Sequence, residues 1–222
     1  VEIGPGKGAL TGHLLNKAEV LAVEIDGACV SVLHKTFAKE IAEGRLTVVH
    51  DNVLHIDLDR LTEFSTTFVS NLPYAISEPF FYALVCSKVK DILLVTSDSF
   101  FDLLQSVDKK AGIYCDQFFT LQKIADIGRD AFDPPPRTDA VLFRLMKKSN
   151  ISEIGELLIQ TDKKVKNALI KMLCEKRSRT QKEAKALIAS QEVLKPLLDK
   201  RIMHLSNNQF LTFYREANAI FK

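Results

Sequence analysis

The chain has 222 residues, of which 46% are hydrophobic and 26% charged, and its formal net charge at pH 7 is +2. This is the composition of a globular protein with room for one sizeable domain and a small one. No apolar run is long enough to span a bilayer and no secretory signal is evident, so we expect neither membrane insertion nor export. The four cysteines have neither metal-ligand nor disulfide-framework spacing, which favours a reducing, cytoplasmic compartment and predicts no metal site.

The charge is distributed unevenly along the chain. Residues 1–146 contain 14 Lys and Arg against 20 Asp and Glu, a net charge of −6, whereas residues 147–222 contain 16 against 8, a net charge of +8. A basic region is typical of proteins that bind nucleic acid. A Lys-rich, solvated helical surface would give the same count, and the charge alone does not distinguish the two.

The chain opens on a glycine-rich turn. Val1–Ile3 reads as the end of a strand, residues 4–8 (Gly-Pro-Gly-Lys-Gly) as a tight turn, and residues 9–16 as a helix with leucines on one face. A strand, a glycine turn and a helix in this order form the nucleotide-binding βα unit, although the turn by itself is a weak signal. Because the chain begins inside a strand, we expect further residues before Val1 in the natural protein.

Two further strands end in acidic residues. Residues 21–26 form the second expected strand, in which Glu24 stands close to the spacing of an acid that binds ribose hydroxyls. Residues 46–52 form the third, and Asp51 would project at the carboxyl edge of a parallel sheet, where it can accept from an adenine amine. The alternatives are a solvated strand end for Glu24 and helix capping for Asp51.

The tetrapeptide Asn71-Leu72-Pro73-Tyr74 follows the fourth expected strand, residues 68–70. Pro73 fixes its own φ and pushes Leu72 towards an extended backbone, so the carbonyls point in fixed directions. Asn71 adds an amide oxygen and Tyr74 a flat aromatic face. This set suits a planar ring with an exocyclic amine, such as adenine, although a capped proline turn with a packed Tyr is the alternative.

The later segments are predicted with less detail. Residues 91–95 and 140–145 read as strands, whereas periodicity leaves residues 117–127 ambiguous between strand and helix. The stiff run Pro134-Pro135-Pro136 would hold Phe132 in place, either in the core or as a second stacking face. Helical spacing returns after residue 150. Four basic positions there are candidates for phosphate contacts, each of them alternatively just solvated: Lys166, Lys171, Arg177 and Arg179.

The order of these motifs resembles that of S-adenosylmethionine-dependent N6-adenine methyltransferases, and in detail the small-subunit ribosomal RNA adenine dimethyltransferases (the KsgA family). The resemblance is carried by residues 2–11, 23–26, 71–77, 131–141, 164–169 and 201–214. These motifs are specific in combination and weak singly. The resemblance implies an α/β fold with a Rossmann-like S-adenosylmethionine-dependent methyltransferase domain, residues 1–147, and a small C-terminal α-helical RNA-binding domain, residues 148–222. It also implies a strand for the first part of residues 117–127.

The resemblance further implies the site. The residues expected to bind S-adenosylmethionine are Glu2, Gly4, Gly6, Glu24, Ile25, Asp51, Asn52 and Asn71. The glycines would approach the methionine part, Glu24 the ribose, and Asp51 and Ile25 the adenine. The residues expected at the target adenine are Asn71, Leu72, Pro73, Tyr74 and Phe132. The Asn71 side chain and the Leu72 carbonyl would accept from the amine, and the aromatic rings would stack on the base.

The expected reaction is therefore N6 dimethylation of adenine in small-subunit ribosomal RNA, carried out by a monomer acting on that RNA or on the pre-ribosomal small subunit. Two alternatives stay open: an RNA-binding or ribosome-assembly factor with little catalysis, and a large-subunit adenine methyltransferase. A NAD-dependent dehydrogenase would also use a glycine turn and a ribose acid, but it has no use for the tetrapeptide.

The sequence departs from the family pattern in four places. The family usually has Asn at Ala75, Gln and Glu at Thr96 and Asp98, and a Tyr-Gly pair at Ala111-Gly112. The N-terminal segment that helps to close over the cofactor in the family is absent from this sequence. We expect these departures to affect the rate and the positioning of the target, and not the core contacts.

Overall fold

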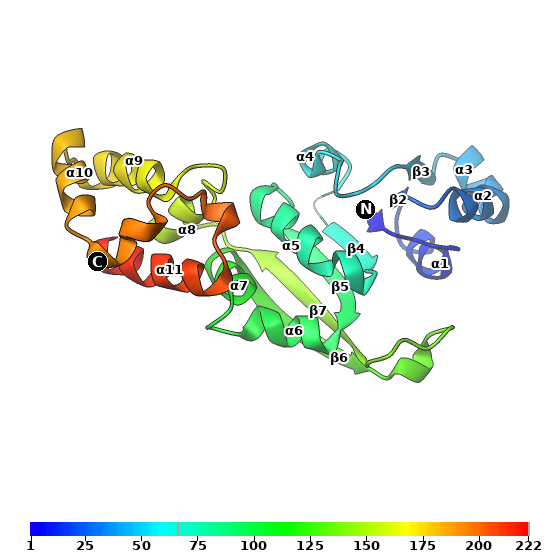
Figure 1. Ribbon diagram of the computed structural model, residues 1–222. Coiled ribbons are helices and arrows are strands. Elements are labelled where there is room, and N and C mark those ends of the chain that lie inside the picture. Colours follow the sequence, from blue (N-terminus) through cyan, green and yellow to red (C-terminus); the bar gives the residue numbers. More distant parts are fainter. Residues whose placement is uncertain (66, 222) are drawn as a thin grey trace. The chain divides into compact units, whose positions relative to one another are not determined.

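The computed structural model describes residues 1–65 and 67–221, and its chain divides into two compact units (Figure 1). Unit 1 comprises residues 1–102 and 119–147, and unit 2 comprises residues 103–118 and 148–222. The chain therefore passes into unit 2 once before the predicted boundary at residue 147 and returns. Thr66 and Lys222 fall inside the predicted domain ranges but lie outside the described residues.

Unit 1 is built on a seven-stranded mixed sheet with the strand order β3-β2-β1-β4-β5-β7-β6. The strands are β1 (Glu2–Ile3), β2 (Val20–Glu24), β3 (Leu46–His50), β4 (Thr67–Asn71), β5 (Asp91–Ser97), β6 (Phe119–Ile127) and β7 (Ala140–Lys147). Strands β1 to β5 are parallel, and β7 runs antiparallel between β5 and β6. The predicted α/β class is confirmed.

The helices of this unit follow the strands in the expected alternation. They are α1 (Ala9–Leu15), α2 (Gly27–Thr36), α3 (Ala38–Ala42), α4 (Leu58–Leu61), α5 (Ser77–Cys86) and α6 (Asp98–Gln105), the last of which runs into unit 2. Strand β2 is buried at every position, as expected for an inner parallel strand with both faces covered. An aromatic cluster supports the other half of the sheet, where the Phe81 ring lies 6.4 Å from Phe100 and 5.8 Å from Phe119.

The ambiguous segment 117–127 is mostly strand. Its first two residues end α7 (Lys110–Phe118), and β6 begins at Phe119, paired with Lys147 of β7. The pairing continues to Ile127, opposite Ala140, with a register shift after Lys123. The backbone of this segment is fixed by hydrogen bonds to β7, which is distant in sequence, so its local periodicity does not identify the strand.

Unit 2 is helical. It contains α7, α8 (Glu153–Leu158), α9 (Val165–Arg177), α10 (Gln181–Ala189) and α11 (Asn207–Phe221). Tyr114 of α7 explains why residues 103–118 belong here: its ring stacks on Phe118 and Phe210 at 5.9 and 5.4 Å, and its hydroxyl donates to the Leu158 carbonyl at 3.1 Å. In the described part of the chain, no helix is long and apolar enough to cross a membrane.

The glycine turn after β1 requires positive φ angles at Gly4 (+65°), Gly6 (+57°) and Gly8 (+93°). Gly8 is also confined by its neighbours, since a Cβ built there would lie 2.4 Å from Cε2 of Phe37. Gly44 has a similar φ of +73° but open space around its Cα. Comparing an alanine substitution at Gly44 with one at Gly8 therefore distinguishes the cost of backbone strain from the cost of a steric clash.

We predict that Gly44→Ala lowers the free energy of unfolding by about 1 kcal/mol, from left-handed backbone strain alone. Gly8→Ala should cost about 3 kcal/mol, because the Phe37 ring must also move. Thermal or urea denaturation of the two variants measures the difference. Equal losses of unfolding free energy would show that the Phe37 ring moves aside without cost and that both losses come from backbone strain alone.

Candidate active site

The strand order reverses direction at β1, which pairs in parallel with β2 on one side and with β4 on the other. Ligands bind at such switch points in open α/β sheets, beyond the carboxyl ends of the strands. The glycine turn after β1 and the tetrapeptide after β4 are consequently neighbours. The Ser70 hydroxyl donates to the Ile3 carbonyl at 2.6 Å, and a Cβ built at Gly4 would lie 3.9 Å from Cδ of Pro73.

The tetrapeptide has a fixed backbone. Asn71 is the last residue of β4, and the N–H of the buried Leu72 continues the sheet by donating to the Val95 carbonyl at 2.9 Å. Pro73 has φ −54° and ψ 129°, and its carbonyl accepts from the Ile76 N–H at 3.0 Å, where the 3₁₀ turn η1 (Tyr74–Ile76) closes. The direction of the Leu72 carbonyl is therefore set on both sides.

Two acceptors of the tetrapeptide have no partner within the described chain. The Asn71 side chain is exposed, and neither its amide nor the Leu72 carbonyl forms a hydrogen bond with another described residue. Both belong to residues that line a cavity of about 640 Å³. The cavity is lined by Ala9, Asn71, Leu72, Pro73, Tyr74, Ala131, Phe132, Asp133, Pro134 and Pro136. The structure thus places all five residues predicted at the target adenine around one cavity.

Tyr74 offers a ring face to this cavity while its hydroxyl is held. The side chain is 38% exposed, and its hydroxyl forms a hydrogen bond with the Thr138 side chain. Burial raises the pKa of Tyr74 above its ordinary value, the Thr138 hydrogen bond lowers it, and the nearby carboxylates of Asp98 and Asp139 raise it further. The phenol is therefore neutral near pH 7, as a stacking group should be.

Phe132 lies on the loop 128–139 that joins β6 to β7, and Asp139 closes the base of this loop. The Asp139 carboxylate accepts from the Arg129 N–H at 3.0 Å, and the Asp139 carbonyl accepts from the Asp98 N–H at 3.2 Å. The Phe132 N–H in turn donates to the Arg129 carbonyl at 3.3 Å. Sequence reasoning missed Asp133, Thr138 and Asp139, and their place in the loop that carries Phe132 was the only signal.

Glu24 joins the glycine turn to the end of β2. One carboxylate oxygen, Oε1, accepts from the N–H groups of Ile25 and Asp26, both at 2.8 Å, and Oε2 accepts from the Gly6 N–H at 2.9 Å. An ionised carboxylate has about four lone-pair sites, so Oε2 retains room for one more donor. The side chain is 6% exposed.

The other predicted cofactor residues at β2 and β3 are open to solvent. Ile25 is 62% exposed, which is unusual for a large apolar side chain. Asp51 follows β3, and its Oδ1 accepts from the Asn52 N–H at 2.7 Å. The Asn52 side chain accepts from the Leu54 N–H at 3.0 Å, so it caps the local turn. Asp51 and Ile25 thus stand at neighbouring strand ends with free surface.

Glu2 differs from the rest, because it is 1% exposed and its Oε2 accepts from the Thr11 hydroxyl at 2.7 Å. Burial raises the pKa of its carboxyl group, the Thr11 hydrogen bond lowers it, and the Glu24 charge raises it. The Glu2 side chain thus lies beneath the glycine turn, and its predicted contact with the cofactor stays a prediction. No group of His, Cys, Asp or Glu in the described residues is arranged to hold a metal ion.

Comparison with known proteins adds to this geometry. The family model "Ribosomal RNA adenine dimethylase" matches residues 1–219. The chain is 31% identical over 186 residues to the ribosomal RNA small subunit methyltransferase A of Coxiella burnetii, covering 76% of this chain and 67% of that protein. It is 33% identical over 159 residues to the protein of the same name from Mycoplasma genitalium, covering 68% of this chain and 60% of that protein.

Two solved structures resemble the fold over nearly the whole chain. A dimethyladenosine transferase from Plasmodium falciparum is 25% identical, with a TM-score of 0.59 over 98% of this chain and 89% of that one. The 23S rRNA methyltransferase ErmE is 16% identical, with a TM-score of 0.58 over the same shares of the two chains, a likeness that shows the fold alone. The predicted Rossmann-like methyltransferase fold is therefore confirmed.

We predict that Asp139→Ala lowers kcat/KM for adenine methyl transfer roughly tenfold, because the loop that carries Phe132 loses its hydrogen bond to Asp139 and the base stacking expected of Phe132 is worth about 1–3 kcal/mol. Asp139→Asn keeps the oxygen that accepts from Arg129 and should stay close to wild type. The kinetics of both variants provide the measurement. If the Asn variant is as impaired as the Ala variant, Asp139 acts through its charge and not by anchoring the loop.

Proposed function

The chain belongs to the ribosomal RNA adenine dimethylase family, and we propose that it dimethylates the N6 amine of adenine in small-subunit ribosomal RNA, with S-adenosylmethionine as the methyl donor. The observation that carries the proposal is the pair of free acceptors, the Asn71 amide and the Leu72 carbonyl, beside one cavity with Tyr74 and Phe132. The partner is the small-subunit RNA or its precursor particle, and the enzyme acts as a monomer in the cytoplasm.

The chemistry required at N6 explains this arrangement. The amine lone pair is delocalised into the adenine ring, so the free base is a poor nucleophile. The Asn71 oxygen and the Leu72 carbonyl accept from the two N–H groups and favour a tetrahedral nitrogen whose lone pair is free to react. These fixed acceptors stabilise charge that develops in the transition state, at no cost in reorganisation. Tyr74 and Phe132 hold the base in the reactive orientation.

The second transfer makes a separate demand on the cavity. A monomethylated amine has one N–H left, so one of the two acceptors suffices to orient it. The first methyl group then needs space, and a cavity of about 640 Å³ lined by Pro73, Pro134 and Pro136 provides apolar surface for it. An adenine within folded RNA is not reachable in place, so the base must be splayed or flipped into the cavity.

The residues at the ends of β1, β2 and β3 fit the cofactor. Gly4 and Gly6 have positive φ angles and no Cβ, which allows close approach to the backbone. Oε2 of Glu24 retains one acceptor site for a ribose hydroxyl, and Ile25 and Asp51 offer an apolar face and an acceptor to the adenine. When bound, S-adenosylmethionine would supply an electrophilic methyl group, and the glycine turn that would hold it lies beside Pro73.

Small-subunit specificity is proposed from the names of the curated relatives, which at 31% and 33% identity are small-subunit enzymes. The large-subunit alternative rests on a likeness of fold at 16% identity, and a non-catalytic assembly factor would have no need for two free acceptors beside a cavity. We therefore rank the small-subunit enzyme first.

The test of this function uses the protein, S-adenosylmethionine and separate small and large ribosomal subunits that lack adenine dimethylation. After digestion of the RNA, mass spectrometry should detect dimethyladenosine in the small subunit only. Its appearance in the large subunit alone would overturn the specificity. Its absence from both, with cofactor and RNA still bound, would favour the assembly factor.

We predict that Asn71→Ala lowers kcat by about 10²-fold or more, the usual effect of removing one fixed polar contact to developing charge. RNA binding should be retained, because the amide contacts only the reacting amine. Asn150→Ala, at an exposed position outside the cavity, is the matched control and should leave the rate unchanged. Unchanged methylation by the Asn71 variant would show that the assigned chemistry is wrong.

We predict that Glu24→Gln weakens S-adenosylmethionine binding roughly tenfold, because an amide N–H₂ replaces an oxygen that faces backbone N–H groups, and such mismatches cost on the order of 1–3 kcal/mol. Asp26→Asn is the control: it removes the same charge two residues away and keeps the oxygen that caps Ala28. Titration calorimetry with the cofactor measures both. Equal losses would mean that Glu24 contributes only charge.

A further inference from the structure

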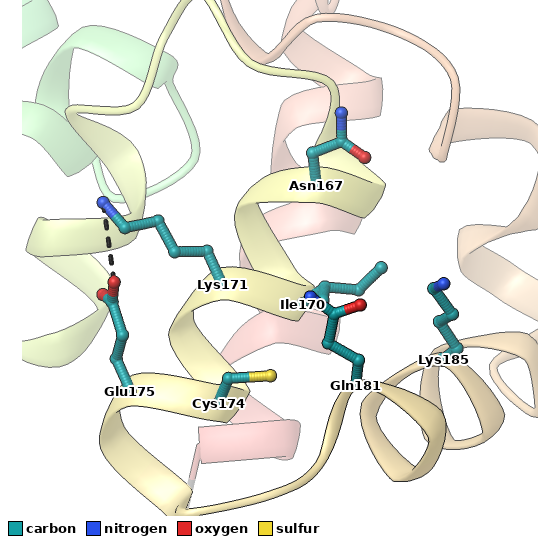
Figure 2. A pocket seen from close by; sticks show the side chains of 7 residues that line it. All are labelled: Asn167, Ile170, Lys171, Cys174, Glu175, Gln181 and Lys185. Carbon is teal, nitrogen blue, oxygen red and sulfur yellow. Dashed lines mark ion pairs between the residues drawn. The ribbon is translucent and has the colours of Figure 1, made fainter.

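A groove of about 450 Å³ runs along α9 and α10 in unit 2. Its lining residues are Asn167, Ile170, Lys171, Cys174, Glu175, Gln181 and Lys185. In Figure 2, Lys171 stands on the α9 side next to Glu175, while Lys185 and Gln181 stand on α10. The half-buried Ile170 and Cys174 form the floor, and exposed polar side chains form the rim.

The ion pairs of unit 2 decide which of its cations are available. Arg177, a predicted phosphate contact, is bound to Glu153 at 3.0 Å and to the carbonyl of Phe221. Lys176 is bound to Glu156 at 2.7 Å. Both charges are compensated within the fold, and neither side chain lines the groove.

The two lysines on the rim of the groove are less strongly paired. Lys185 has no ion pair or hydrogen bond with any residue that the structure describes. The Lys171 ammonium lies 3.8 Å from the Glu175 carboxylate, and both side chains are about half exposed. An exposed pair at this distance contributes little, so Lys171 can turn towards a stronger anion.

The chemistry of the rim indicates the occupant. Ammonium groups bind phosphate oxygens, and the amides of Asn167 and Gln181 both donate and accept, which suits phosphates and ribose 2′-hydroxyls. No aromatic ring and no guanidinium lines the groove, so it offers no platform for an unstacked base. The set fits the RNA backbone better than it fits a base or an apolar peptide.

We propose that the groove between α9 and α10 docks the sugar–phosphate backbone of the substrate RNA, with Lys171 and Lys185 bound to its phosphates from the two sides of the groove; this rests on the proposed function. Backbone contacts of this kind position an RNA without reading its sequence. Unit 2 thus supplies affinity and register, and the tetrapeptide of unit 1 supplies the choice of an adenine amine.

The experiment compares the binding of Lys171→Gln/Lys185→Gln and wild-type protein to a full-length small-subunit RNA transcript over a range of salt concentrations. The control, Lys176→Gln/Lys195→Gln, loses the same charge from residues already paired with Glu156 and Glu192. We expect the groove variant to bind roughly tenfold more weakly near physiological salt, with a log–log salt slope smaller by about 1.4–1.8. The control should bind like the wild type.

Glu175→Gln supplies a test of opposite sign. Removing the acid frees Lys171 and removes a repelling charge, so this variant should bind the RNA more tightly than the wild type. A misfolded protein would not show that gain, and thermal denaturation should place the midpoints of all the variants close together.

Three results would overturn the proposal: an unchanged salt slope in the groove variant, an equal loss in the control, or a loss that appears with assembled subunits but not with naked RNA, which would indicate a protein partner. Methyl transfer at saturating RNA is measured separately. If the wild type binds but does not methylate, the proposed function fails, while an altered salt slope in the groove variant still supports RNA docking.

Discussion

The parallel pairing of β1 with β4 is the contact on which the candidate active site depends. Strand β1 is only two residues long, and it pairs at Glu2 with Val69 of β4 and with Ala22 of β2. The hydrogen bond from Ser70 to the Ile3 carbonyl adds a side-chain tie between the same two strands. This register brings two turns from opposite ends of a 70-residue segment together, so that Pro73 borders Gly4. In the proposed function, the methyl donor lies at one turn and the amine at the other, and this register is what would bring them together.

Glu24, a residue of the proposed cofactor site, also holds part of the fold together. Its carboxylate accepts three backbone N–H groups, one of them from Gly6 in the glycine turn, and hydrogen bonds to a charged group are the stronger kind. The turn is therefore held in a conformation that needs positive φ angles before any ligand arrives. Pre-organisation of this sort lowers the entropy lost on binding. The same carboxylate that orders the turn has one acceptor site left, which we propose for a ribose hydroxyl.

Features that depend on neighbouring residues could be predicted from the sequence, whereas contacts between residues far apart in the chain could not. The tetrapeptide was found because Pro73 and the end of β4 define its backbone within a few residues. The anchoring of Phe132 by Asp139 was missed, since it depends on which residues the β6–β7 pairing brings together. That residues 103–118 fall in unit 2 was likewise not visible in the sequence, because Tyr114 packs on Phe210, far along the chain. The sequence also does not show that Arg177 is paired with Glu153, whereas Lys185 has no ion pair among the residues that the structure describes.

The residues that line the cavity include none of the four departures from the family pattern, although Ala75 and Asp98 lie next to Tyr74. Thr96 is fully buried, and its hydroxyl donates a hydrogen bond to the Ser97 carbonyl. Its side chain therefore contacts the end of β5 and does not line the cavity. Asp98 begins α6, and its N–H group ties that helix to the Asp139 carbonyl. In the pair Ala111-Gly112 the glycine of the family pattern is retained. Its lack of a side chain is required here, because a Cβ at Gly112 would lie 1.8 Å from the Ser106 carbonyl oxygen. Asp98 is tied by its hydrogen bond with Asp139 to the loop that carries Phe132, so we expect a change at Asp98 to affect how the target base is held and not the acceptors at its amine.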